Sequence, residues 1–306
     1  MHENSAGTSR RNFLSTVARG AAAATAAPWL LSTRSAAEDE KGRWPLKLST
    51  SSIHFIHRPI EEACERIAKL GFEAIDIWDS FQGCPHLGDV DKRLGAEGLK
   101  SLLDKHKLRL FAFSLYVAVN NAEEFSRHLE LLGNAGGGVA VRGSSGPCDP
   151  RELKTKMKAF LESLKPQAEL AGKNKCRIAV ENHGSALLDS PDSLKAFVDM
   201  NTSPHLGIAL APYHIQAGKW SVEESIGVCG KQLFFFYAWQ LAGGTAQLPG
   251  HGPADFTPWI SALARAKYDG YINAFMHGDL EPDDMAKALA KSREYLKGCH
   301  AKAALK

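Results

Sequence analysis

Polar side chains stand at the ends of four short apolar runs in this sequence of 306 residues. One run ends in Glu181 and His183, and three others lead to His214, Gln240 and His277. Carboxylate and imidazole groups bind divalent metals, and they also accept and deliver protons. A single polar ending is normally only a loop, whereas four at corresponding points of a repeated unit indicate one shared pocket.

Strand-like runs alternate with helix-like segments throughout residues 46–298, and this alternation must position the polar endings. The predicted strands are 46–50, 74–78, 108–115, 138–141, 178–181, 207–210, 233–238 and 271–275. Each precedes a segment with helical spacing of apolar residues, such as the one that Pro59 opens and Gly71 follows. Eight such pairs, of about 25–35 residues each, predict the α/β class and a single (β/α)₈ TIM barrel, with its active site at the C-terminal ends of the strands.

The first residues have the pattern of an export signal. Arg10 and Arg11 precede a weakly apolar, alanine-rich run at 17–31, and small residues follow at 35–37. A twin-arginine (Tat) signal peptide has this pattern, and the run is too short to favour a membrane anchor. We therefore expect a signal at 1–37, a barrel domain at 38–306, and passage through the Tat translocase to a periplasmic or extracellular location without stable membrane association after cleavage.

Charge and motifs exclude several classes of function. Loss of residues 1–37 removes four arginines and one glutamate, which lowers the net charge by three, from +3 to zero. A neutral chain offers no electrostatic argument for binding nucleic acid. No GxGxxG follows the first predicted strand, so we expect no nucleotide cofactor. The six cysteines form no CxxC pair, and we expect free thiols.

Four segments resemble strands two, five, six and eight of the xylose-isomerase-like TIM barrels, the sugar phosphate isomerase/epimerase superfamily. They are GFEAIDIWDS (71–80), IAVENHG (178–184), HLGIALAPYH (205–214) and YDGYINAFMHG (268–278). The resemblance covers most of residues 46–298. It implies a small-molecule carbohydrate substrate and a divalent metal held by Glu on strand five, Asp on strand six, His or Gln on strand seven and Glu on strand eight.

This sequence matches only part of that ligand set. Glu181 stands at the strand-five position, but the strand-six Asp is replaced by Ala211 and the strand-eight Glu by Phe275. Because side chains alternate along a strand, His277 lies on the same face as Phe275 and can take over its role. His214 matches a family histidine that touches the substrate.

The resemblance therefore implies Glu181, His214 and His277 as catalytic groups. With Gln240 as a fourth member, the same side chains form the expected metal set, which suits Zn, Mn, Fe or Co better than Mg. Further candidates for substrate contact lie near other strand ends: His183, Trp78, Tyr213, His251, His54 and His86. Core filling by the aromatic rings and simple exposure of the histidines remain open alternatives.

The expected reaction is metal-assisted removal of a proton next to a carbonyl of a carbohydrate, as in isomerases and epimerases. A lyase acting on an oxidised sugar is one alternative, because elimination needs only one base and an electrophile. A carbohydrate-binding barrel that has lost catalysis is the other alternative, and Ala211 and Phe275 favour it.

Overall fold

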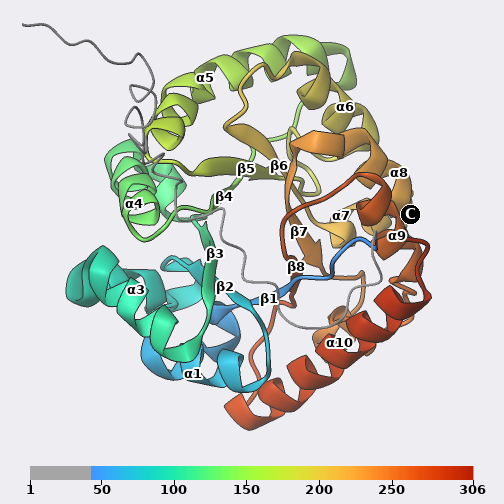
Figure 1. Ribbon diagram of the computed structural model, residues 1–306. Helices are drawn as coiled ribbons and strands as arrows, with labels where there is room; N and C mark the ends of the chain where they lie inside the picture. The colour runs from blue at the N-terminus through green and yellow to red at the C-terminus, as the bar shows by residue number, and fades with distance from the viewer. Residues whose placement is uncertain (1–42, 306) are drawn as a thin grey trace, which may run out of the picture. The chain divides into compact units, whose positions relative to one another are not determined.

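The computed structural model describes residues 43–305, and within them eight parallel strands close into one barrel, with β8 paired to β1 (Figure 1). The strands are β1 (Leu48–Ser51), β2 (Ala74–Trp78), β3 (Arg109–Ser114), β4 (Val139–Gly143), β5 (Arg177–Glu181), β6 (Leu206–Leu210), β7 (Leu233–Ala238) and β8 (Ile272–Ala274). This confirms the predicted (β/α)₈ barrel. The predicted signal at 1–37 lies outside the described residues.

Helices surround the barrel on its outside, as Figure 1 shows. They are α1 (Ile60–Lys69), α2 (His86–Asp89), α3 (Gly95–His106), α4 (Ala122–Asn134), α5 (Leu153–Lys173), α6 (Pro191–Met200), α7 (Pro212–Ala217), α8 (Val222–Cys229), α9 (Thr257–Arg265) and α10 (Pro282–Lys302). The two short helices α2 and α7 were not predicted. They lie in the connections that follow β2 and β6, at the end of the barrel where the candidate side chains stand.

Local sequence signals set several of these boundaries. Pro59 stands at the N-cap of α1, and Ser190 forms a capping box with Ser193 at the start of α6. Gly137 and Gly138 precede β4 with positive φ values of 83° and 144°. A Cβ atom at Gly138 would lie 2.7 Å from the Phe111 carbonyl oxygen, so this turn between α4 and β4 requires glycine.

Alternation along the strands separates two apolar cores. Ile178 and Val180 of β5 face outward into the layer between barrel and helices, whereas Ala179 and Glu181 face the barrel interior. The interior core includes large aromatic residues: Trp78, Phe111, Phe235, Tyr237, Trp239 and Phe275. Polar groups that face the interior are therefore held among aromatic rings and away from water.

Two further features concern the cysteines and the character of the helices. All six cysteines are free, as predicted, and five of them are buried. Among residues 43–305, no helix has both the length and the apolar character needed to span a bilayer.

Candidate functional site at the C-terminal end of the barrel

Glu181 is the last residue of β5, and its side chain is only 7% exposed. Its Oε2 atom accepts a hydrogen bond from the Tyr116 hydroxyl at 2.7 Å. Burial raises the pKa of Glu181 to about 7, and the charge of Asp76 acts in the same direction, while the Tyr116 hydrogen bond opposes the rise. The structure thus provides a carboxylate that changes protonation near neutral pH.

Two tyrosines connect this carboxylate to the barrel interior. Tyr116 lies two residues after the end of β3, and its hydroxyl is 3.0 Å from the Tyr237 hydroxyl on β7. Burial and the nearby charge of Glu181 hold the pKa of both phenols well above their ordinary value. Both tyrosines are therefore neutral at physiological pH and can serve as hydrogen-bond donors.

Stacked aromatic rings form one wall beside these groups. Trp78 and Phe275 stack with ring centroids 5.3 Å apart and planes 9° from parallel. Tyr213 and Trp239 stack at 4.3 Å and 14°. Tyr213 is only half-buried, so part of its ring is accessible to solvent, whereas Trp239 is buried. Such rings offer both apolar surface and polar edges.

His277 stands beside the same wall, with its ring perpendicular to Trp239 at 5.0 Å and to Phe275 at 5.0 Å. Both residues lie beyond the end of β8, which stops at Ala274, so their ring contact forms in the loop after the strand and not by alternation along it. Gln247 holds the backbone of His277 on both sides: its Oε1 atom accepts from the His277 N–H at 3.2 Å, and its Nε2 atom donates to the His277 carbonyl at 2.8 Å. The same Oε1 atom accepts from the Trp239 indole at 2.7 Å. One glutamine therefore fixes two residues of the wall.

His214 lies on helix α7 rather than on an extension of β6, because Pro212 starts a helix at that point. Its ring packs 4.0 Å from the ring of His183, which is exposed. Burial lowers the pKa of His214 to about 3, and the neighbouring His183 and His277 add to the effect. The Nε2 atom of His214 is buried and has no hydrogen-bond partner among residues 43–305.

Three predicted histidines are bonded to other parts of the protein through their ring nitrogens. His54 is buried beside Phe275, with ring centroids 5.5 Å apart, and its Nδ1 lies 2.9 Å from the Thr50 hydroxyl while its Nε2 accepts from the Met276 N–H. His86 bonds through Nε2 to the Arg58 carbonyl, and His251 bonds through Nε2 to the carbonyl of Ala288 on α10. These contacts place His86 and His251 apart from the group around Glu181, so the prediction of a binding role for them has no support in the geometry.

The predicted metal ligands do not converge. Among residues 43–305, no three side chains of the histidine, cysteine, aspartate or glutamate type lie close enough to hold one ion. Gln240 is fully buried, and its amide donates to the Leu248 carbonyl and accepts from the Ala254 N–H. His214 does have a free ring nitrogen, but one free ligand does not make a site. The residues present therefore do not fit a divalent cation.

Asp76 lies near enough to Glu181 for its charge to affect the Glu181 pKa, and it was not among the predicted site residues. It is fully buried on β2, and it accepts hydrogen bonds from the Ser51 hydroxyl at 2.7 Å, the Trp78 indole at 2.6 Å and the Ser114 hydroxyl at 2.9 Å. Burial raises its pKa to about 7. The signal was present in the sequence, since an aspartate inside the apolar strand AIDIW requires buried partners.

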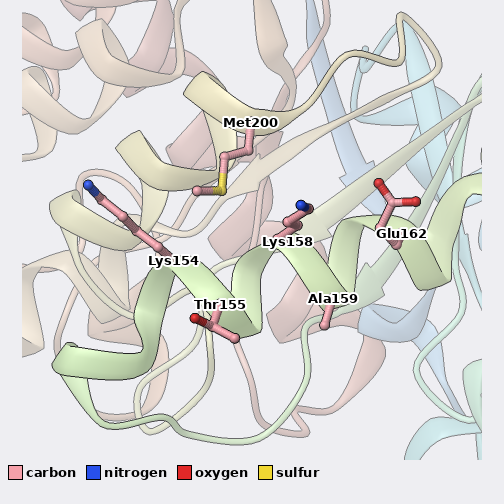
Figure 2. A pocket seen from close by; sticks show the side chains of 6 residues that line it. All are labelled: Lys154, Thr155, Lys158, Ala159, Glu162 and Met200. Atoms are coloured by element: carbon pink, nitrogen blue, oxygen red, sulfur yellow. The ribbon is translucent and has the colours of Figure 1, made fainter.

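Two hollows lie outside this group of side chains. One of about 560 Å³ is an open groove on the outer helices, lined by five residues of α5 and by Met200 of α6 (Figure 2). Glu162 in this groove pairs with Lys165, and α5 covers the outside of the barrel, away from the strand ends. The other, of about 280 Å³, lies between the connections after β1 and β8, where His57 and Asp279 are bonded at 2.6 Å. Neither hollow is lined by Glu181, Tyr116, His214 or His277.

Solved structures with the same fold include sugar-converting enzymes. The 3-keto-D-glucoside 4-epimerase YcjR from E. coli superposes with a TM-score of 0.66 at 17% identity, over 82% of this chain and 100% of that chain. A D-tagatose 3-epimerase-like protein superposes with a TM-score of 0.65 at 20% identity, over 85% and 100%. The IOLI protein, solved with a binding zinc atom, gives 0.67 at 17% identity, over 85% and 100%. At these identities the likeness shows the fold.

No curated protein matches the sequence. A family model does match, over residues 64–299, and it spans every strand from β2 to β8 together with Glu181, His214 and His277. The chain therefore belongs to the family of Xylose isomerase-like TIM barrels.

Proposed function

We propose that this protein is a sugar isomerase- or epimerase-like enzyme that removes a proton from the carbon next to a carbonyl group, with Glu181 as the base. The observation that carries the proposal is the buried carboxylate at the end of β5, whose pKa is raised to about 7 and which is bonded to Tyr116. A base with a pKa near the working pH both accepts and returns a proton efficiently. Family membership and the epimerase neighbours support a carbohydrate as the substrate.

The step balances with side chains of this chain alone. The proton moves from carbon to a Glu181 oxygen, the C–H electron pair forms the enolate double bond, and the carbonyl oxygen gains the negative charge. That oxygen needs a hydrogen-bond donor at the moment when charge develops. His214 is neutral and has an unpartnered Nε2 atom among the described residues, so an Nε2–H tautomer can supply the bond.

The surrounding charges favour an uncharged sugar over a sugar phosphate. Among the described residues, no lysine or arginine is a cause of the pKa shifts of Glu181, His214 or His277. Phosphate groups are normally bound by such cations. The half-buried Tyr213, stacked on Trp239, instead offers aromatic surface suited to the apolar side of a sugar ring.

A single base limits the stereochemistry. The two other carboxylates that the family resemblance implies are replaced by Ala211 and Phe275, and both of these residues are buried. One base can remove a proton and return it on the same side, which suits isomerisation. The same feature also suits elimination, so a lyase acting on a keto sugar is the second candidate. The metal assistance predicted from the resemblance has no part in these steps.

Proton exchange tests the proposal without knowledge of the product. The purified protein is incubated in D₂O with a panel of ketoses, aldoses and 3-keto-glycosides, and NMR follows loss of the C–H signal next to each carbonyl. We expect exchange with at least one sugar, and a decrease of at least about 100-fold in Glu181→Gln, a typical contribution of a general base. Glu123→Gln, an exposed residue of α4, is the matched control.

The outcomes separate the candidates. Exchange followed by a new sugar isomer supports an isomerase, and exchange followed by an unsaturated product supports a lyase. Tight sugar binding with no exchange in the wild type would contradict the enzymatic proposal and favour a binding barrel.

Export also remains a proposal. The twin arginines and the small-residue exit at 35–37 support passage through the Tat translocase to a periplasmic or extracellular location.

A further inference from the structure

Asp79 is the first residue after β2, and it is buried, with only 3% of its surface exposed. Its backbone N–H donates to the carbonyl of Ser114, the last residue of β3, at 3.0 Å. Its Oδ2 atom accepts from the Val117 N–H at 2.7 Å and from the Ala118 N–H at 3.0 Å. Asp79 therefore bonds to the chain on both sides of residues 115–116, and we call residues 115–118 the Tyr116 turn.

The other carboxylate oxygen of Asp79 holds a second turn beside the same tyrosine. Oδ1 accepts from the Phe81 N–H at 3.1 Å, two residues along the chain. The Phe81 ring packs against the Tyr116 ring with centroids 5.9 Å apart, and Trp78 packs against Tyr116 at 5.0 Å. Two aromatic rings from the end of β2 thus contact the phenol, and Asp79 lies between them in the sequence.

Tyr116 needs such support because it lies beyond the end of β3, in the connection to α4. The barrel strands therefore do not fix its backbone directly. Hydrogen bonds from N–H groups to a carboxylate are stronger than those between neutral groups. With three of them, one buried side chain orders both turns before any substrate arrives.

The position of Tyr116 decides which oxygen of Glu181 is free. The Tyr116 hydroxyl donates to Oε2 at 2.7 Å, and among residues 43–305 no other group donates to the Glu181 side chain. A carboxylate has two oxygens, and each can accept a proton or a hydrogen bond. Oε1 is therefore the oxygen that remains for the substrate.

We propose that Asp79 is a positioning residue that fixes the Tyr116 hydroxyl against Oε2 of Glu181, so that Oε1 takes the proton from the substrate carbon. The role of Oε1 rests on the proposed function, in which Glu181 is the base. In that step the C–H bond breaks, an O–H bond forms at Oε1, and the electron pair stays with the substrate as the enolate. Asp79 takes no part in the proton transfer itself.

Two substitutions of Asp79 separate the bonds of its two oxygens. Asp79→Asn keeps a carbonyl oxygen that can accept from both Val117 and Ala118, and its NH₂ group then faces the Phe81 N–H. The hydroxyl of Asp79→Ser is one atom closer to the backbone. It can serve the local turn at Phe81 but does not reach Val117 and Ala118. The asparagine therefore keeps the bonds to the Tyr116 turn, and the serine breaks them.

NMR of the whole chain, isotope-labelled at the Cζ atoms of its six tyrosines, tests these bonds without substrate. Tyr116→Phe identifies the Tyr116 signal. We expect this signal to shift and broaden in Asp79→Ser and to stay near its wild-type position in Asp79→Asn. The signal of Tyr268, whose hydroxyl donates to the Tyr271 carbonyl, is the internal reference and should not move. Asp255→Ser, at an exposed aspartate that also accepts an N–H two residues along, is the matched control.

Backbone hydrogen exchange of the wild type gives a second test, which does not depend on a variant that folds. The amides of Val117 and Ala118 should exchange much more slowly than those of an unstructured chain, because both donate to Asp79. Exchange of both amides at the unstructured rate would overturn the proposal. So would a Tyr116 signal that stays unchanged in Asp79→Ser, or a Tyr268 signal that moves as far as the Tyr116 signal.

Sugar exchange, where it is measurable, connects these bonds to the chemistry. Tyr116→Phe and Asp79→Ser should each slow the exchange at least about 10-fold, the size of one hydrogen bond to a charged group, and Asp79→Asn should retain most of it. The double variant should be no slower than the slower single variant, because both changes remove the same contact. Losses that multiply would show that Asp79 does not act through Tyr116, and they would overturn the proposal.

The two sets of measurements keep this proposal apart from the proposed function. The expected NMR result with no exchange of any sugar would reject Glu181 as a base, together with the role of Oε1. It would still support the positioning of Tyr116 by Asp79.

Discussion

Replacing Glu181 by Gln should stabilise the fold above neutral pH, although it should also stop proton exchange. The pKa of this side chain rises from an ordinary value of 4.5 to about 7 in the folded protein. Below about pH 4.5 the group is protonated in both the folded and the unfolded chain and makes no difference. Between about pH 4.5 and 7 the unfolded chain releases the proton and the folded chain keeps it, so stability decreases as pH rises.

The magnitude follows from the size of the shift. A difference of about 2.5 pKa units at about 1.4 kcal/mol per unit amounts to about 3 kcal/mol of stability lost between acid and mildly alkaline pH. The amide that replaces the carboxyl group carries no charge at any pH, so Glu181→Gln removes this loss. For a chain of this size, about 3 kcal/mol corresponds to roughly 6–12 °C in Tm.

Urea unfolding of wild type and Glu181→Gln in a series of buffers between about pH 4 and 8.5 measures the effect. The quantity of interest is the change in the stability difference with pH, because any packing effect of the amide is the same at every pH. Asp76 is present in both proteins, so the effect of its own burial is common to both curves, and only its charge interaction with Glu181 differs between them. Glu123→Gln, on the exposed side of α4, should give a curve parallel to the wild type.

Parallel curves for wild type and Glu181→Gln would refute the reasoning, since they would show that Glu181 is not destabilised by burial. A variant that is less stable than the wild type above neutral pH would be equally informative. A divalent cation bound to Glu181 would favour the ionised form, so the variant would lose stability and a chelator would lower the Tm of the wild type. Because the predicted ligands do not converge among residues 43–305, we expect a chelator to leave that Tm unchanged.

Two further predictions concern other parts of the chain. Gln247→Ala removes the hydrogen-bond partner of the Trp239 indole and both backbone partners of His277. We therefore expect a loss of roughly 1–3 kcal/mol in the free energy of unfolding measured with urea, and a clear decrease in sugar exchange. Unchanged stability would show that Gln247 does not hold Trp239 and His277 in place. Replacing Arg10 and Arg11 by Lys should leave uncleaved precursor inside the cell, as detected by fractionation and immunoblot, whereas normal maturation of the double variant would argue against the Tat route.

The barrel could be predicted because the relevant signals are local. The predicted strands 74–78 and 233–238 agree with β2 and β7 at both ends. Strand β8 is shorter than predicted, and helix α7 was missed because Pro212 and Tyr213 follow an apolar run without a helical repeat of their own. Glu181 could be chosen as the central residue from its place after the fifth strand.

The roles of individual polar groups depended on tertiary contacts. Gln240 has the residue type and position of a ligand, but its amide is bonded to the backbone at Leu248 and Ala254. His86 and His251 also stand after strands, and their ring nitrogens bond to carbonyl groups far away in the sequence. Whether a polar side chain faces a pocket or satisfies the backbone is decided by neighbours that the sequence does not place.

The sequence by itself determined the architecture and pointed to the candidate site, because strand periodicity, helix signals and the order of elements are local properties that fix a parallel barrel and its C-terminal end. Only the tertiary structure decided which groups act together. Barrel closure brings Ser51, Ser114 and Tyr237 from three strands around Asp76, and it buries Asp76 and Glu181 in the barrel interior. The resulting pKa values arise from desolvation and from hydrogen bonds and charges that barrel closure brings together, among them a contact between tyrosines 121 positions apart in the chain.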